Sequence, residues 1–287
     1  MKGSLRVSRS FLEGEFQAPD GIRLSYFSSF ASEGGNPLLL ILHGFGEHSR
    51  RYLPLIEELK DLPFGFAACD LRGHGRSGGE RVYADSFLQY AEDLEAFLDF
   101  LTGRYPGHSG EMLLFGHSMG AEIAALFALQ NPARVRELIL SSPCFGLFPG
   151  IPLGARVARL LGRRFPHTVL KNPVKPVFLS HDPVEVSEYE SDPLVERRIT
   201  LGLVREMIDA GETILARAGE ILIPVRMLVA GNERIVDKHA AKEFYGKIAS
   251  TDKRWIEFDG FYHDLFREMD RGRCVETLRN ILKAFSV

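Results

Sequence analysis

One stretch decides the fold of this chain: Met112-Leu113-Leu114-Phe115-Gly116-His117-Ser118-Met119-Gly120-Ala121. Its apolar start predicts a buried strand, and the apolar residues 121–129 predict a helix. A strand that turns directly into a helix strains the backbone of the corner residue, Ser118, and small neighbours keep the two elements from colliding. The pattern therefore predicts a serine hydroxyl held above a sheet edge. The alternative, a turn with an incidental serine, is disfavoured because a strand precedes it and a helix follows.

Two backbone N–H groups are candidates for stabilising a negatively charged oxygen near this serine. The helix N-terminus beneath Ser118 supplies a free N–H, that of Met119, together with a positive dipole. A second glycine-rich loop, residues 43–46, follows the apolar run 37–42, which is typical of a strand buried on both faces. Such loops bring N–H groups close to a ligand, and the N–H of Phe45 is the second candidate. A plain tight turn is the alternative for this loop.

Length and composition limit the class of protein. The 287 residues fit one large α/β domain with an insertion, and a formal charge of −3 gives no sign of a nucleic-acid partner. The first ten residues lack the apolar core of a secretory signal, and no run approaches the roughly 18 apolar residues of a membrane span. Cys69, Cys144 and Cys274 are few and far apart, which predicts buried reduced thiols. These features favour a cytoplasmic protein.

The remaining pattern predicts a mostly parallel, doubly wound sheet. Further apolar runs at 64–69, 137–142, 224–230 and 253–258 predict strands, and they alternate with helical patterns such as residues 83–105. Residues 13–19 and 23–30 predict a hairpin at one sheet edge. Residues 143–222 show no clear strand and are rich in proline. We therefore expect a core of residues 1–142 and 223–287, with 143–222 inserted as a helical cap over Ser118.

One helix of the predicted cap is strongly amphipathic. Its apolar face holds Leu153, Val157, Leu160 and Leu161, and its basic face holds Arg156, Arg159, Arg163 and Arg164. A basic amphipathic helix can lie on a membrane surface, which would give the cap a peripheral membrane contact. In the more common alternative the apolar face packs on the core and the arginines are solvated.

A serine nucleophile requires a base and an acid that orients the base. In sheets that carry such a serine turn, the order along the chain is serine, acid, histidine, each on a loop after a strand. His263 directly follows the last predicted strand and is the predicted base. Glu233 and Asp237 both follow the strand before it. Glu233, at the strand tip, is the predicted acid, and Asp237, just before a helix, is a natural N-cap and the alternative acid.

Five motifs carry a resemblance to a known family: residues 43–52 (HGFGEHSRRY), 70–77 (DLRGHGRS), 116–120 (GHSMG), 191–195 (SDPLV) and 235–237 (IVD). With them the chain resembles the monoacylglycerol lipase and lysophospholipase family of α/β-hydrolases. The resemblance implies an α/β-hydrolase fold, a single-chain glycerolipid substrate, Phe45 and Met119 as oxyanion donors, and a cap with an apolar acyl tunnel. The chain departs from the family at Glu233, where an aspartate is expected, so the loop must absorb one extra methylene.

The leading hypothesis is a serine carboxylic ester hydrolase that cleaves monoacylglycerols through an acyl-enzyme, with no metal or organic cofactor. A lysophospholipase and a broad carboxylesterase use the same machinery and remain alternatives. A non-catalytic binding protein of the same fold is disfavoured because Ser118 and His263 are both present. Head group, acyl chain length, substrate-binding residues and oligomeric state cannot be deduced from the sequence.

Overall fold

The structure is a computed structural model that describes residues 11–30, 36–105, 112–147 and 152–285. A sheet of eight strands runs through the molecule in the order β1-β2-β4-β3-β5-β6-β9-β10. The strands are β1 (Leu12–Gln17), β2 (Arg23–Ser29), β3 (Leu38–Leu42), β4 (Gly65–Cys69), β5 (Met112–His117), β6 (Glu137–Ser141), β9 (Val225–Ala230) and β10 (Lys253–Phe258). The hairpin strand β2 joins β4 antiparallel, and all later neighbours are parallel. The predicted doubly wound sheet with an edge hairpin is confirmed.

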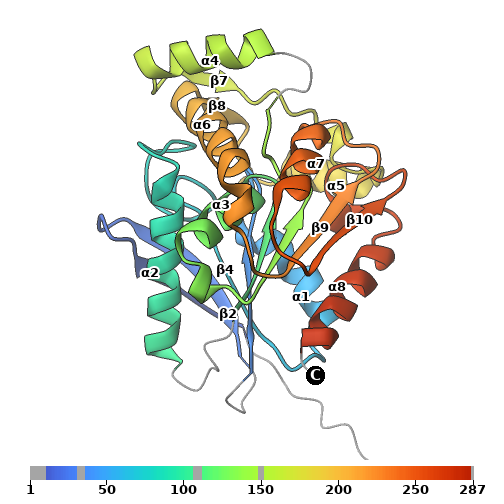
Figure 1. Ribbon diagram of the computed structural model, residues 1–287. Helices are drawn as coiled ribbons and strands as arrows, with labels where there is room; N and C mark the ends of the chain where they lie inside the picture. Colours follow the sequence, from blue (N-terminus) through green and yellow to red (C-terminus); the bar gives the residue numbers. More distant parts are fainter. Residues whose placement is uncertain (1–10, 31–35, 106–111, 148–151, 286–287) are drawn as a thin grey trace, which may run out of the picture.

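Helices cover both faces of this sheet (Figure 1). They are α1 (Leu53–Leu59), α2 (Leu88–Arg104), α3 (Met119–Gln130), α7 (Lys238–Lys247) and α8 (Gly272–Phe285). Short 3₁₀ helices lie at Ser49–Tyr52, Pro132–Arg134, Pro176–Phe178, Ala218–Glu220 and Leu265–Arg267. In β3, Leu40 and Leu42 pack into the cluster that contains α2, α3 and α7, whereas Leu39 and Ile41 pack into the cluster that contains α1 and α8. Successive side chains thus enter opposite cores, which explains the unbroken apolar run.

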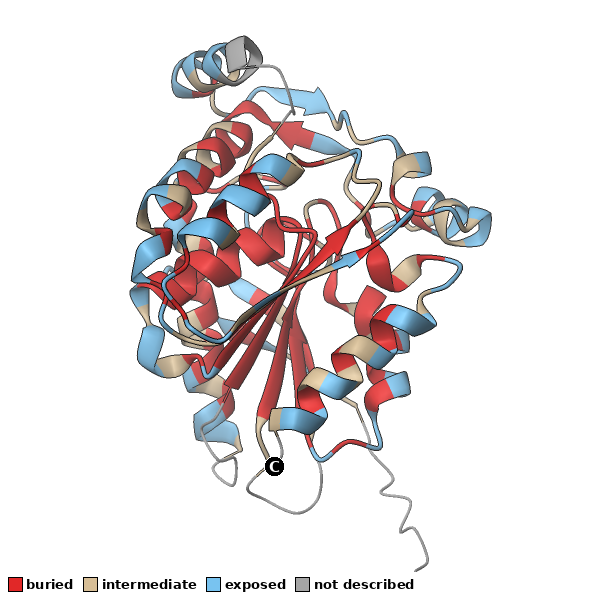
Figure 2. Cartoon of the chain, turned by 45° about the vertical axis from the view of Figure 1, so that its right-hand side comes forward, coloured by how far each residue is buried: buried red, intermediate tan, exposed pale blue. Residues whose placement is uncertain are grey.

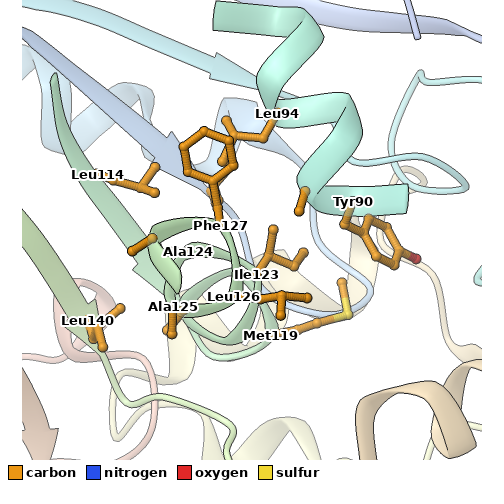
Figure 3. Close-up of a cluster of buried hydrophobic side chains, with 14 of the residues drawn as sticks. Tyr90, Leu94, Leu114, Met119, Ile123, Ala124, Ala125, Leu126, Phe127 and Leu140 are labelled. Atoms are coloured by element: carbon orange, nitrogen blue, oxygen red, sulfur yellow. The ribbon is translucent and has the colours of Figure 1, made fainter. Parts of the chain in front are cut away.

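Helix α3 lies between the sheet and α2, and Figure 3 shows its side chains against Tyr90 and Leu94. Every residue from Met119 to Leu129 is buried, including Glu122, so the helix is enclosed on all sides rather than amphipathic. The three cysteines are buried free thiols, as predicted. Helix α2 begins at Leu88, later than the predicted residue 83, and the N–H of its N-cap residue, Phe87, donates to Glu206 of the inserted segment.

The segment 143–222, called the cap here, lies between β6 and β9 in the sequence, and α4, β7 and β8 lie beyond the carboxyl ends of the parallel strands (Figure 1). Its elements are α4 (Pro152–Arg164), β7 (Val169–Lys171), α5 (Pro183–Ser191), β8 (Arg198–Thr200) and α6 (Leu201–Arg217). The prediction that this segment holds no strand is wrong, since β7 and β8 form an antiparallel pair. Each has only three residues, too few for an alternating pattern to be visible in the sequence.

The described apolar side chains of α4 are exposed, and Figure 2 shows much of this helix in the exposed colour. Val157 is 49% exposed, Leu160 69% and Leu161 40%, so the alternative in which this face packs on the core is wrong for these three residues. The side chain of Leu153 lies outside the described residues. Arg159 does not share the solvated face of the other arginines, because it forms ion pairs with Asp209 and Glu212, both on α6. Helix α4 is therefore attached to α6 by a charged contact.

Candidate active site

Ser118 occupies the sharp turn that the sequence predicts. Strand β5 ends at His117 and α3 begins at Met119, so Ser118 alone joins them, with φ 53° and ψ −118°. A positive φ is unfavourable for a residue with a Cβ, and such strain is typical of functional positions. It is maintained here by the packing of both elements, and it leaves the Ser118 side chain lining two hollows at the carboxyl edge of the sheet.

The two glycines around Ser118 are required by close backbone approach. A Cβ on Gly116 would lie 2.3 Å from the carbonyl oxygen of Gly120, and a Cβ on Gly120 would lie 2.3 Å from that of Leu42. Both distances are far below van der Waals contact, so any larger residue would push α3 away from β5 or β3. This observation confirms the steric reason given for the Gly-x-Ser-x-Gly pattern.

His263 and Glu233 meet at the ends of neighbouring strands. Parallel β9 and β10 are in register, with Ala230 opposite Phe258, so the loops that follow them leave the sheet side by side. Nδ1 of His263 donates a hydrogen bond to Oε2 of Glu233 across 2.8 Å, and both side chains are almost fully buried. The second carboxylate oxygen, Oε1, accepts from the backbone N–H groups of Arg234, Ile235 and Val236. The loop thus wraps around the longer glutamate side chain.

The electrostatics of this pair favour a charged acid and a basic imidazole. Burial raises the pKa of Glu233, but the charge and hydrogen bond of His263 and the loop N–H groups lower it more, so the pKa lies below its ordinary value. Burial lowers the pKa of His263, but the Glu233 carboxylate raises it more, so the pKa lies above its ordinary value. His263 is therefore a better proton acceptor than a free histidine would be.

Asp237 lies elsewhere. It is the N-cap of α7, and its Oδ1 accepts a hydrogen bond from the N–H of His239 at 2.8 Å. This is the capping position predicted for it. Of the two acids that the sequence left open, the structure brings Glu233 to His263 and leaves Asp237 on the helix.

The loop after β3, residues 43–48, is called the oxyanion loop here, and His43 fixes the orientation of its peptide groups. Nε2 of His43 accepts from the N–H of Leu71 at 2.9 Å, so Nδ1 carries the proton and donates to the carbonyl of Gly44 at 2.8 Å. In a trans peptide the N–H points opposite the carbonyl, so the N–H of Phe45 faces away from this bond. The N–H groups of Phe45 and Met119 find no acceptor in the described part of the chain.

Two hollows meet at Ser118. The larger, of about 570 Å³, is lined mainly by apolar cap residues and opens toward β7 and the 3₁₀ helix at Pro176–Phe178; Phe45 and Ser118 form its inner end. The smaller, of about 30 Å³, is lined on its polar side by Glu47, His117, Tyr189 and His263. Phe45, Val174, Leu179 and Ile235 complete its wall. The serine thus lies between a large apolar hollow and a small one of mixed lining that holds the catalytic histidine.

A buried cluster of charges behind the small hollow was missed by sequence reasoning. Glu47 accepts from Nε of Arg51 at 3.1 Å and from the N–H of Gly44 at 3.2 Å, and Arg51 also pairs with Asp264 at 3.5 Å. Burial raises the pKa of Glu47, but the charges of Arg51 and of the nearby histidines lower this pKa by more than burial raises it. Glu47 is therefore ionised at neutral pH. Its place in the motif 43–52 was a signal, but only the fold shows that it faces the site.

Residues 36–270 match a protein family described as "Serine aminopeptidase, S33". The chain belongs to this family of α/β-hydrolases. It is 31% identical to monoglyceride lipase from Homo sapiens over 85% of this chain and 81% of that protein. The crystal structure of Paleococcus ferrophilus monoacylglycerol lipase superposes with a TM-score of 0.81 at 30% identity, covering 90% of this chain and 98% of the other. The chain is also 29% identical to the uncharacterized protein YnbC of Escherichia coli (strain K12) over 87% of its length, but spans only 43% of YnbC.

The predicted resemblance to the monoacylglycerol lipase-like α/β-hydrolases is therefore confirmed, and the protein is a lipolytic serine ester hydrolase. In the part of the chain that the structure describes, no group of three or more His, Cys, Asp or Glu side chains is arranged to hold a metal ion.

Proposed function

We propose that this hydrolase cleaves monoacylglycerols to fatty acid and glycerol through an acyl-enzyme on Ser118. The Ser118 hydroxyl attacks the ester carbonyl while His263 takes its proton, and Glu233 stabilises the imidazolium that forms. The oxyanion accepts hydrogen bonds from the N–H groups of Phe45 and Met119. His263 then returns the proton to the leaving glycerol oxygen, and water attacks the acyl-enzyme with His263 as base.

The observation that carries this proposal is the position of His263 on the wall of the small hollow. The group that protonates the leaving alcohol has to lie on the same side as that alcohol, so the alcohol occupies the small hollow and the acyl chain the large apolar one. Glu47, His117 and Tyr189 on its wall carry groups that can bond the hydroxyls of glycerol. No lysine or arginine lines this hollow in the described part of the chain, so a phosphate-bearing alcohol would lose its hydration without gaining a cationic partner, and a lysophospholipid fits less well.

The test is a hydrolysis panel in which the acyl chain is held constant. We expect faster hydrolysis of 1-oleoylglycerol than of lysophosphatidylglycerol or lysophosphatidylcholine with the same chain, and stoichiometric labelling of Ser118 by a fluorophosphonate. Preferred turnover of the lysophospholipids would favour the phospholipase alternative, and equal turnover of short-chain nitrophenyl esters would favour a broad esterase. Labelling without turnover of any ester would contradict the hydrolytic function.

The acid assignment gives a stability prediction for Asp237. Replacing Asp237 with alanine removes the N-cap of α7 and should lower the free energy of unfolding by about 1 kcal/mol, while kcat stays within a factor of two. Urea unfolding and hydrolysis of a nitrophenyl ester measure the two quantities. A large loss of kcat with unchanged stability would mean that Asp237, and not Glu233, serves the histidine.

We also propose that the cap docks on anionic membrane surfaces. The exposed apolar side chains of α4 continue toward β7, and the set comprises Val157, Leu160, Leu161, Phe165, Val169 and Leu170. Three cations that line the large hollow, Lys171, Lys175 and Arg234, suit a negatively charged lipid surface at its mouth. No helix in the described part of the chain is long and apolar enough to cross a bilayer.

Leu160→Ser should weaken binding to vesicles of phosphatidylglycerol and phosphatidylcholine roughly tenfold, because a buried leucine contributes about 1.5–3 kcal/mol. Leu222→Ser is the matched control. Leu222 is 73% exposed, but it precedes β9 and so lies at the amino ends of the parallel strands, away from α4. Co-sedimentation at low and high salt measures the binding. Equal binding by both variants would show that α4 does not contact the lipid.

A further inference from the structure

One part of the cap contacts the loops that carry the site. This part, residues 179–196, contains α5 and is called the brace here. Its two ends lie against different loops of the core: the loop after β10, residues 259–268, which carries His263 and is called the histidine loop, and the oxyanion loop, which carries Phe45. The contacts are backbone and charged hydrogen bonds rather than loose apolar packing.

The first end of the brace holds the neighbours of His263. The carbonyl of Leu179 accepts from the N–H of Asp264, the residue directly after His263, at 2.8 Å. The Glu268 carboxylate, 2% exposed, accepts from Nδ1 of His181 at 2.8 Å and from the N–H of Tyr262, directly before His263, at 2.7 Å. The backbone on both sides of the base is therefore tied to the brace, once directly and once through Glu268.

The second end holds the neighbours of Phe45. The N–H of Glu196 donates to the carbonyl of Gly46 at 2.7 Å, and Oδ2 of Asp192 accepts from Nε2 of His48 at 2.8 Å. Gly46 has φ +74°, and a Cβ there would lie 2.7 Å from the carbonyl oxygen of Glu196. The two backbones thus touch at the residue directly after the candidate oxyanion donor.

Between its ends the brace forms a wall of the small hollow. Tyr189 of α5 is 5% exposed, lines this hollow together with Ser118, and lies with its ring centroid 5.2 Å from the guanidinium carbon of Arg51. The ion pairs of α4, in contrast, go to α6, another part of the cap. Within the cap, the brace is therefore bound to the catalytic loops, whereas α4 is bound to α6.

We propose that the brace belongs to the catalytic frame rather than to a lid, with Asp192 as a positioning residue for the oxyanion donor Phe45. The proposal rests on the function proposed above. Oxyanion donors act at about 2.7–3.1 Å from the developing charge, so a small shift of the oxyanion loop weakens the transition state more than substrate binding. A change that breaks a contact between the brace and either loop should consequently lower kcat and leave KM nearly unchanged.

The test is Asp192→Ala in the full chain. We expect kcat for a short nitrophenyl ester to fall roughly 10- to 100-fold, with KM within a factor of two, and fluorophosphonate labelling of Ser118 to slow by a similar factor. Asp192→Asn keeps the hydrogen bond from the N–H of Leu194 to one side-chain oxygen but turns a donor toward Nε2 of His48, so it isolates the His48 contact and should also lower kcat at unchanged KM. Asp182→Ala is the matched control: Asp182 caps the other end of α5 through the N–H of Val184, so its loss should affect stability without lowering kcat.

Equal kcat in Asp192→Ala and Asp182→Ala would overturn the proposal, as would a loss that follows only the unfolded fraction. Should Asp192→Ala not fold, His181→Ala tests the other end, where the side chain is 41% exposed and tolerates truncation. His181→Ala should lower kcat at unchanged KM, and an unchanged kcat would contradict the proposal that the brace positions the catalytic loops. Fluorophosphonate labelling reports on Ser118 and does not require ester turnover. If the proposed function is wrong, the parent chain itself fails to hydrolyse the ester. If the brace proposal is wrong, the variants are labelled as fast as the parent.

Discussion

Ser118→Ala should reduce kcat for ester hydrolysis by about 10⁶-fold with little change in stability, because it removes the nucleophile and leaves only binding and the oxyanion hole. His263→Ala should cause a similar loss, since the hydroxyl is a poor nucleophile without a base. Active-site titration with a fluorophosphonate and steady-state hydrolysis of 1-oleoylglycerol measure both effects. Ser118→Ala should also abolish labelling.

The double variant is the decisive control for this prediction. Residues that act as one unit give losses that do not multiply, so Ser118→Ala with His263→Ala should be little slower than either single variant. Multiplied losses would show that the two side chains contribute through separate steps and would contradict the proposed mechanism.

Glu233→Gln should lower kcat roughly 10⁴-fold while the fold is retained. Three backbone N–H groups hold Oε1 of Glu233, so in the variant the acceptor oxygen of the amide stays with them and the amide nitrogen faces His263. A donor at that position forces Nδ1 of His263 to become an acceptor, and Nε2 then carries the proton and cannot take one from Ser118. The structure thereby specifies which tautomer the substitution produces.

The same variant has a predicted pH signature. The Glu233 carboxylate raises the pKa of His263, and the base works only when neutral, so activity in the parent falls as the pH drops below that raised pKa. Without the carboxylate the pKa of His263 falls, and the acid limb of residual kcat/KM should move to lower pH. A limb that does not move, or a kcat within tenfold of the parent, would contradict the assignment of Glu233.

Much of the fold and of the candidate site was predictable because the signals are local. Strands buried on both faces require continuous apolar runs, and the turn at Ser118 requires small neighbours at Gly116 and Gly120. The position of His263 after the last strand follows from the order of strands alone. β7 and β8 escaped prediction because their three residues are too few to show a pattern.

The sequence by itself determined the α/β architecture and the serine turn, since each depends on residues close together in the chain. The order of serine, acid and histidine followed from the order of the predicted strands. Only the tertiary structure decided that Glu233 meets His263, because that contact depends on two neighbouring strands and on a loop that folds its N–H groups onto one carboxylate oxygen. It also decided which face of α4 looks outward. An amphipathic pattern shows which side chains share a face, but the face that meets the protein is the one where Arg159 pairs with α6 and Gly162 lies against the backbone of Leu201.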